Sequence, residues 1–257
     1  GYDYGLEQAR DGHASVVVDR LGYPASAGPD GNAVCYGSQA DVLDQVVDAL
    51  RAGTYRAGDA AGPGFRRVAL AGHSAGGFIA EMTQYSFASA DALAVLGYSD
   101  SFASPLVIQT LTAASARCVT APDRAAGEGT PANYAYFGQT ESDFRAGHVV
   151  DADERVVAEA LVKRPRDPCG DLLSIPPSFA ANQPFVRTIS SPVLLVLGRQ
   201  DAFFPPPAGA LQSGFGFSGS EDVSYVELPG TGHGLTLGRT HDRFRAAMHA
   251  WLTARGF

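Results

Sequence analysis

One run of eleven residues, 68–78, constrains the fold of this 257-residue chain more than any other segment. Its apolar residues predict a buried strand near 67–71, and a helix from about 75 to 88 follows directly. A G-x-S-x-G pattern centred on Ser74 joins the two, and this pattern is typical of a sharp strand-to-helix turn. Such a turn exposes the serine hydroxyl at the end of the strand, so Ser74 is a candidate nucleophile.

The residues around Ser74 fit a turn of this kind. Strand and helix come so close together that the positions two before and two after the serine must be very small, and both are glycine, Gly72 and Gly76. The turn also directs the backbone N–H of Ala75 toward the atom that the serine attacks, where it would stabilise an oxyanion. His73 fills the variable position of the pattern, and we expect it to pack structurally.

Strands and helices alternate along most of the chain. This alternation predicts an α/β fold with a mostly parallel sheet and helices on both faces. The valine run at 16–18 is typical of a buried parallel strand, Ser38 is a plausible helix N-cap and Gly53 a plausible stop. We expect five core strands, near 14–19, 67–71, 92–98, 192–197 and 223–228, and core helices near 38–52, 75–88 and 240–254, where Trp251 packs in the core.

Residues 105–189 break this rhythm and are too many for a bare loop. We expect this insertion, with a helix near 153–163, to fold over the C-terminal edge of the sheet as a lid. The core would then comprise residues 1–104 and 190–257. Cys118 and Cys169 flank the insertion and could be joined by a disulfide, which would leave Cys35 free; three reduced thiols are the alternative.

Several classes of protein are disfavoured by composition. The net charge of −8 disfavours nucleic acid and anionic membranes as partners. No apolar stretch approaches the roughly 18 residues that a membrane span needs. The N-terminus lacks the pattern of a signal peptide, although a processed secreted chain would look the same. The cysteines fit no zinc motif, and we expect neither a metal nor a cofactor.

A carboxylate and an imidazole follow two later strands. Asp201 ends the run Gly-Arg-Gln-Asp after the strand at 192–197, and His233 lies in a Gly-rich loop after the strand at 223–228. Because parallel strands deliver their C-terminal loops to one edge, we expect both side chains to meet Ser74 there. Asp100 also follows a core strand and is the alternative acid.

These segments together resemble the α/β-hydrolase superfamily. The resemblance rests on the turn at 72–76, on residues 198–201 and on residues 230–233. The run at 19–26 is similar to the loop after an early strand in those enzymes. The resemblance to this superfamily implies that Ser74 is the nucleophile, His233 the general base and acid, and Asp201 the group that orients His233.

A narrower resemblance is to uncharacterised secreted bacterial members with a cysteine-containing cap, which implies secretion; a cytoplasmic location is the alternative. The family carries an oxyanion-hole donor on a His-Gly loop before the segment that matches 14–19. This chain begins Gly-Tyr-Asp-Tyr and contains no such loop. We therefore expect an N-terminal segment to be absent from this numbering; otherwise the second donor comes from elsewhere.

The function expected from these features is a serine hydrolase that cleaves an ester or lactone of a small-molecule acyl substrate through an acyl-enzyme. Two alternatives stay open: a lyase or cyclase with the same triad, and a catalytically silent small-molecule-binding protein. His13 and His148 have no evident partners, and His241 and His249 fit a solvated helix face better than a metal site. The expected pocket walls, which could equally be packing residues, are Phe203, Phe204, Tyr134, Tyr136 and Phe137.

Overall fold

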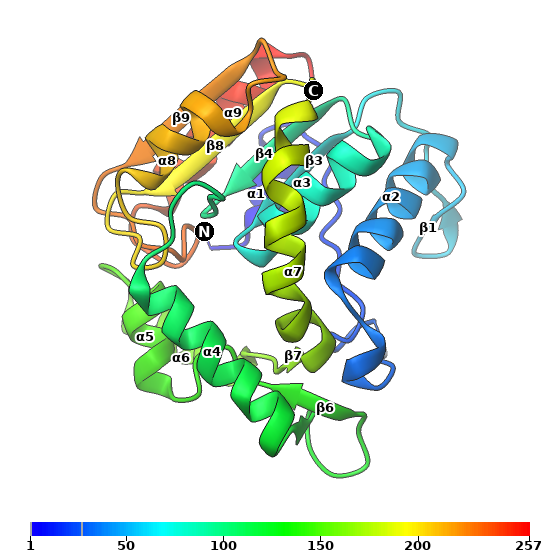
Figure 1. The fold of residues 1–257 in the computed structure, drawn as a ribbon. Helices are drawn as coiled ribbons and strands as arrows, with labels where there is room; N and C mark the ends of the chain where they lie inside the picture. The colour runs from blue at the N-terminus through cyan, green and yellow to red at the C-terminus, as the bar shows by residue number, and fades with distance from the viewer. Residues whose placement is uncertain (1, 27) are drawn as a thin grey trace.

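A four-stranded parallel sheet, in the order β3-β4-β8-β9, forms the centre of the molecule (Figure 1). The structure is a computed structural model that describes residues 2–26 and 28–257; Gly1 and Ala27, which fall in the predicted core region, lie outside the described residues. All four strands run in the same direction, so their C-terminal ends share one edge. The strands are β3 (Ala69–His73), β4 (Ala92–Leu96), β8 (Val193–Gly198) and β9 (Val223–Leu228).

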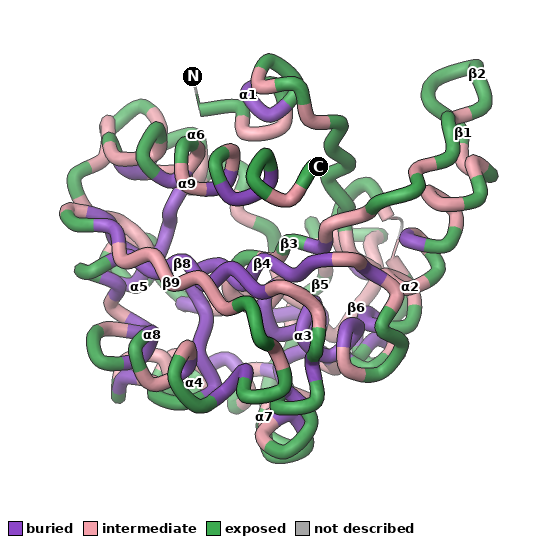
Figure 2. Tube along the Cα trace, turned by 90° about the horizontal axis from the view of Figure 1, so that it is seen from above, coloured by how far each residue is buried: buried purple, intermediate pink, exposed green. Residues whose placement is uncertain are grey.

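Helices cover both faces of this sheet (Figure 2). Side chains of β4 alternate between the two layers: Leu93 and Val95 face one apolar cluster, while Ala94 and Leu96 face the other. Trp251 is buried in the second cluster, as predicted. One face carries α1 (Tyr4–Arg10) and α9 (His241–Ala254); the other carries α2 (Tyr36–Ala52), α3 (Ala75–Phe87) and α8 (Ala208–Leu211).

The strand predicted at 14–19 is wrong. Val16, Val17 and Val18 are 55%, 79% and 37% exposed, and no described strand pairs with them. A valine run favours burial, but its backbone also needs donors and acceptors from a neighbouring strand. The sheet ends at β3 without one, so it has four strands instead of five.

The predicted helix at 38–52 begins two residues earlier than expected. Its N-cap is Cys35, whose backbone N–H donates to Ser38 Oγ at 3.0 Å. Ser38 therefore acts from the third helical position, as the reciprocal partner in a capping box, and is not the N-cap itself. The helix ends at Ala52 and is capped by Gly53, which has a left-handed φ of 66° as expected for a glycine at this position.

Residues 105–189 lie between β4 and β8, and we call them the β4–β8 segment. Its helix α7 packs against α2 and α3, which attaches the segment to the core (Figure 1). A disulfide joins Cys118 to Cys169 and so links α4 to the start of α7, while Cys35 is exposed and free. The segment contains α4 (Pro105–Thr120), β5 (Asp123–Arg124), β6 (Ala132–Ala135), α5 (Glu141–His148), α6 (Glu154–Lys163), β7 (Asp167–Pro168) and α7 (Cys169–Phe185).

Short elements complete the described chain. Strands β5, β6 and β7 form an antiparallel sheet within the β4–β8 segment, and β1 pairs with β2 in a separate hairpin. These remaining elements are η1 (Gly31–Ala33), β1 (Arg56–Ala57), β2 (Ala60–Ala61), η2 (Val186–Thr188) and η3 (Gln212–Gly216).

Candidate active site

Ser74 occupies the predicted turn between β3 and α3. Its φ of 53° and ψ of −121° are unusual for a residue other than glycine. The turn is held by the Ser74 N–H, which donates to Leu96 O at 2.8 Å, and by the Gly77 N–H, which donates to Ser74 O at 2.8 Å. Ala75 is the first residue of α3, so its N–H has no acceptor within the helix.

Of the two glycines that flank Ser74 in the turn, the structure requires only one to lack a side chain. A Cβ atom at Gly72 would lie 2.0 Å from Gly76 O, which the fold cannot accommodate. A Cβ atom at Gly76 would meet nothing within 4 Å. The strand and the helix are thus in the close contact that the sequence predicts, but only Gly72 is sterically required.

Asp201 and His233 are in direct contact. His233 Nδ1 donates to Asp201 Oδ2 at 2.9 Å, and both side chains are almost completely buried. Asp201 Oδ1 accepts from the backbone N–H groups of Phe203 and Phe204 at 2.8 and 3.0 Å. Burial alone would raise the pKa of Asp201, but attraction to His233 and these hydrogen bonds lower it below its usual value.

The two loops that carry this pair touch each other. Gln200 N–H donates to Thr231 O at 2.9 Å, and a Cβ atom at Gly198 would lie 2.3 Å from the same carbonyl oxygen. The end of β8 therefore has to be glycine for the loop after β9 to approach. This contact fixes the separation of Asp201 and His233 through the backbone.

His233 also lies against the turn that carries Ser74. His73 Nε2 is 2.7 Å from His233 O, and the two rings have their centroids 4.8 Å apart. His233 Nε2 is buried and has no hydrogen-bond partner among the described residues, so no hydrogen bond joins it to Ser74 Oγ. Catalytic hydrogen bonds are often long in the absence of substrate.

Asp100, the alternative acid, belongs to a different cluster. Its carboxylate accepts from Tyr98 Oη at 2.7 Å, from Asn182 Nδ2 at 2.8 Å and from Gln212 Nε2 at 3.1 Å. Burial and the nearby Asp100 raise the pKa of Glu81 in the same cluster. The structure thus pairs His233 with Asp201 and uses Asp100 to connect α3, α7 and η3.

His148 is a neighbour of His233 that the sequence did not reveal. The ring centroids of the two residues are 5.3 Å apart, and His148 O accepts from the Gly234 N–H at 3.0 Å. His148 Nδ1 is 3.0 Å from Phe144 O, so it carries the proton and leaves Nε2 as an acceptor. Burial and the nearby His233 lower the pKa of His148 to about 3 and that of His73 to about 4.

A cavity of about 250 Å³ opens beside Ser74 and Ala75. Of the predicted wall residues, Phe137 and Phe204 line it. Phe203 lies behind, fully buried, with its ring centroid 4.8 Å from that of His233. The remaining walls are mainly apolar and include Phe78, Tyr98, Val107, Leu111, Leu172 and Ile175.

Tyr134 and Tyr136 do not line this cavity. Tyr134 is fully buried in β6, where its hydroxyl donates to Pro29 O at 3.1 Å, because the β4–β8 segment packs there on the loop before α2. Tyr136 lies beneath the guanidinium groups of Arg164 and Arg166. Both tyrosines line a second cavity of about 550 Å³ instead.

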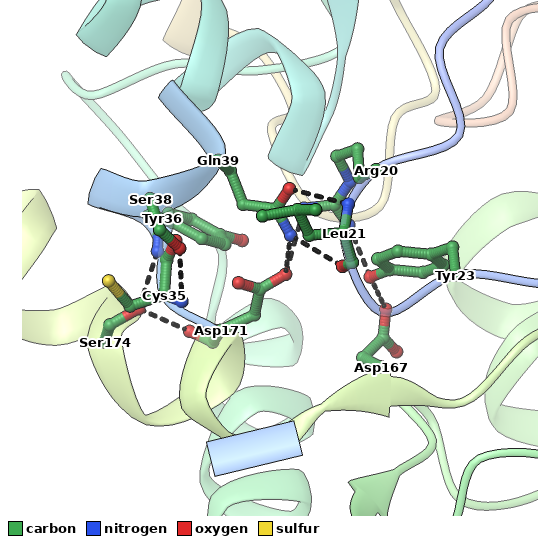
Figure 3. Close-up of polar contacts among 10 residues, drawn as sticks. All are labelled: Arg20, Leu21, Tyr23, Cys35, Tyr36, Ser38, Gln39, Asp167, Asp171 and Ser174. Carbon is green, nitrogen blue, oxygen red and sulfur yellow. Dashed lines mark hydrogen bonds and ion pairs between the residues drawn. The ribbon is translucent and has the colours of Figure 1, made fainter. Parts of the chain in front are cut away.

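One wall of the cavity beside Ser74 is polar and includes Arg20, Tyr23, Asp167 and Asp171, whose polar contacts Figure 3 shows. Arg20 Nη1 donates to Asp171 Oδ2 at 3.1 Å, and Gln39 Nε2 donates to the same oxygen at 3.0 Å. Arg20 also contacts Tyr23 Oη, which donates to Asp167 Oδ1 at 2.6 Å. We call these five residues the Arg20 cluster. Sequence reasoning missed it because Arg20 and Asp171 are 151 positions apart.

Two further observations concern binding and location. Within residues 2–26 and 28–257, no group of three or more His, Cys, Asp or Glu residues is arranged to hold a metal ion, and His13 Nε2 is instead 3.0 Å from His249 Nδ1. None of the helices in that part of the chain has the length and apolar character needed to cross a membrane.

The parallel sheet, its covering helices and the sharp turn at Ser74 define the α/β-hydrolase fold. A model of the alpha/beta hydrolase family matches residues 1–247, and the chain belongs to this family. Family membership supports a hydrolase in the broad sense. Comparison of the sequence with curated proteins gives no match.

Solved structures share the fold at low sequence identity. A thermophilic esterase from Thermogutta terrifontis matches with a TM-score of 0.66 and 18% identity over 98% of this chain and 84% of its own. A monoacylglycerol lipase from Paleococcus ferrophilus matches with a TM-score of 0.62 and 16% identity over 92% and 81%. A methylesterase from Arabidopsis matches with a TM-score of 0.62 and 15% identity over 97% and 92%.

Proposed function

We propose that this protein is a serine hydrolase that cleaves an ester or lactone, with Ser74 as nucleophile, His233 as general base and acid, and Asp201 as the group that orients His233. The observation that carries the proposal is the buried Asp201–His233 hydrogen bond of 2.9 Å next to the strained turn of Ser74. Asp201 fixes the proton on His233 Nδ1, which leaves a lone pair on Nε2. That nitrogen has no other partner among the described residues.

The reaction then follows two half-reactions. Ser74 Oγ attacks the carbonyl carbon while His233 Nε2 takes its proton, and the Ala75 N–H stabilises the oxyanion. The tetrahedral intermediate collapses, and His233 returns the proton to the leaving alcohol. Water, deprotonated by His233, next attacks the acyl group on Ser74; when the bond from Ser74 Oγ to the acyl carbon breaks and the acid leaves, His233 returns its proton to Ser74 Oγ.

The histidines around His233 suit this cycle. His73 and His148, with pKa values of about 4 and about 3, are neutral near pH 7. Neither therefore repels the positive charge that His233 acquires during each half-reaction. Asp201, whose pKa is lowered, remains ionised and stabilises that charge.

We further propose that the β4–β8 segment is a cap over the site, within a core of residues 1–104 and 190–257. Phe137 from this segment and Phe204 from the core line the cavity together, which supports an apolar acyl or alcohol group. The Cys118–Cys169 disulfide is typical of oxidising compartments and supports secretion. The esterase, lipase and methylesterase with this fold agree with ester chemistry.

A fluorophosphonate probe tests the proposal. We expect it to label the wild-type protein stoichiometrically and to leave Ser74→Ala unlabelled. Hydrolysis of p-nitrophenyl esters should be lost in the same variant. Labelling that persists in Ser74→Ala would show that another residue is the nucleophile.

A further inference from the structure

The Arg20 cluster contains one acceptor that the protein does not use. Asp171 lines the cavity beside Ser74 and is 2% exposed. Its Oδ2 accepts from Arg20 and Gln39, whereas its Oδ1 is buried without a hydrogen-bond partner among the described residues. Buried polar atoms are nearly always hydrogen-bonded, and an unpaired carboxylate oxygen is costly. Because Asp171 lines the cavity, its unpaired oxygen is suited to a donor on a ligand bound there.

Asp171 is held in place for such a role. Gln39 bonds both to Asp171 Oδ2 and to the backbone of Leu21, through Leu21 N at 3.1 Å and Leu21 O at 3.0 Å (Figure 3). Ser174 Oγ donates to Asp171 O at 3.0 Å and accepts from Tyr36 N at 3.2 Å. Core residues thus hold the carboxylate through Oδ2, and Ser174 links the backbone of Asp171 to the start of α2.

The charges around the cavity decide which donor fits. Its lining contains two arginines, Arg20 and Arg164, and two aspartates, Asp167 and Asp171. A cation at Asp171 would lie near Arg20, and an anion would meet the Asp171 carboxylate that already binds the Arg20 guanidinium. A neutral donor avoids both repulsions, and a hydroxyl group is the simplest one.

We infer that Asp171 Oδ1 accepts a hydrogen bond from a hydroxyl group of the substrate, so that the protein selects small hydroxylated esters. This inference rests on the proposed ester hydrolysis at Ser74. The apolar walls Val107, Leu111 and Ile175 would hold the hydrocarbon between the ester and the hydroxyl. A cavity of about 250 Å³ restricts the substrate to a short chain.

Matched substrates test the inference. One series comprises p-nitrophenyl esters of short acids that end in hydroxyl, methoxy, methyl or ammonium groups, and a second comprises acetate monoesters of short diols with their methoxy counterparts. A methoxy group accepts but cannot donate. We expect wild-type kcat/KM for the hydroxyl member of at least one series to exceed that for the methoxy member about 10- to 100-fold. Equal rates in both series, or preference for ammonium, would overturn the inference.

Asp171→Asn tests the residue. Its amide oxygen would take the donors Arg20 and Gln39, which places an N–H donor where Oδ1 stands. A hydroxyl oxygen and a methoxy oxygen can both accept a hydrogen bond from that N–H, so the preference for the hydroxyl substrate should disappear. Asp123→Asn removes another carboxylate of the β4–β8 segment, one paired with Arg117 outside the cavity, and should keep the preference. A preference that survives in Asp171→Asn would show that another group binds the hydroxyl.

Fluorophosphonate labelling of Asp171→Asn reports whether its site is assembled. Should this variant fail to fold, the wild-type comparison of hydroxyl with methoxy still decides. Calorimetric binding of the intact diol monoacetates and their methoxy counterparts to Ser74→Ala separates the two proposals. Selective binding without hydrolysis by wild type would refute only the hydrolase, whereas hydrolysis without selectivity would refute only the role of Asp171.

Discussion

Asp201→Asn tests the proposed proton relay through the tautomer of His233. The carboxylate accepts three hydrogen bonds, two from the backbone N–H groups of Phe203 and Phe204 and one from His233 Nδ1. The single oxygen of an amide would stay with the two backbone donors, because an NH₂ group there would face both of them. The NH₂ group would then face His233 Nδ1 and force the ring proton onto Nε2, where it blocks transfer from Ser74.

We expect kcat to fall by roughly four orders of magnitude, which is about 5.5 kcal/mol of transition-state stabilisation. The measurement is the initial rate on a p-nitrophenyl ester, normalised to the fraction of folded protein. Asp100→Asn is the matched control at the alternative acid position, and its kcat should stay close to wild type. An Asp201→Asn protein with more than about a tenth of wild-type kcat would refute the reasoning.

Three further predictions concern stability. Gly72→Ala should lower the free energy of unfolding, measured by urea titration, by about 3 kcal/mol or more, because the new Cβ would lie 2.0 Å from Gly76 O. Gly76→Ala should be neutral or stabilising by up to about 1 kcal/mol, because a Cβ there meets nothing within 4 Å. Equal effects of the two substitutions would contradict the one-sided steric requirement. Replacing Cys118 and Cys169 together by serine should cost about 2–4 kcal/mol, while Cys35→Ser, at an exposed free thiol, should cost little; an unchanged melting temperature in the double variant would argue against the disulfide. His148 is neutral in the folded protein, where its pKa is about 3, but it gains a proton on unfolding when the pH lies below its ordinary pKa of 6.5. Its contribution to the free energy of unfolding is therefore present at neutral pH and is lost as the pH falls from 6.5 toward 3. His148→Phe should therefore make the acid-side decrease in unfolding free energy shallower by up to about 1.4 kcal/mol per pH unit between pH 4 and 6, and an identical pH dependence in the two proteins would be evidence against a neutral His148.

Local sequence patterns predicted the parts of the site that lie at strand ends. The turn at Ser74, the glycine before it, and the loops that bring Asp201 to His233 each belong to one strand and its following residues. The direction of parallel strands is enough to place such loops at a shared edge. Here the sequence indicated the turn at Ser74 and the contact of Asp201 with His233, while the catalytic roles of these residues stay a prediction.

The rest depends on contacts between distant segments. His148 reaches His233 from α5, and Arg20 meets Asp171 across the boundary between the core and the β4–β8 segment. Nothing in the local pattern of either pair marks it. Val16 to Val18 show the converse, because a pattern typical of a buried strand stays exposed where no neighbouring strand pairs with it.

Covalent trapping of the acyl group tests the central claim most directly. Wild-type protein, quenched in acid during turnover of a p-nitrophenyl ester, should gain the mass of one acyl group on the peptide that contains Ser74. Ser74→Ala should gain none. An acyl group on a different residue, or turnover without any adduct in wild type under conditions where deacylation is rate-limiting, would contradict Ser74 as the nucleophile of this protein.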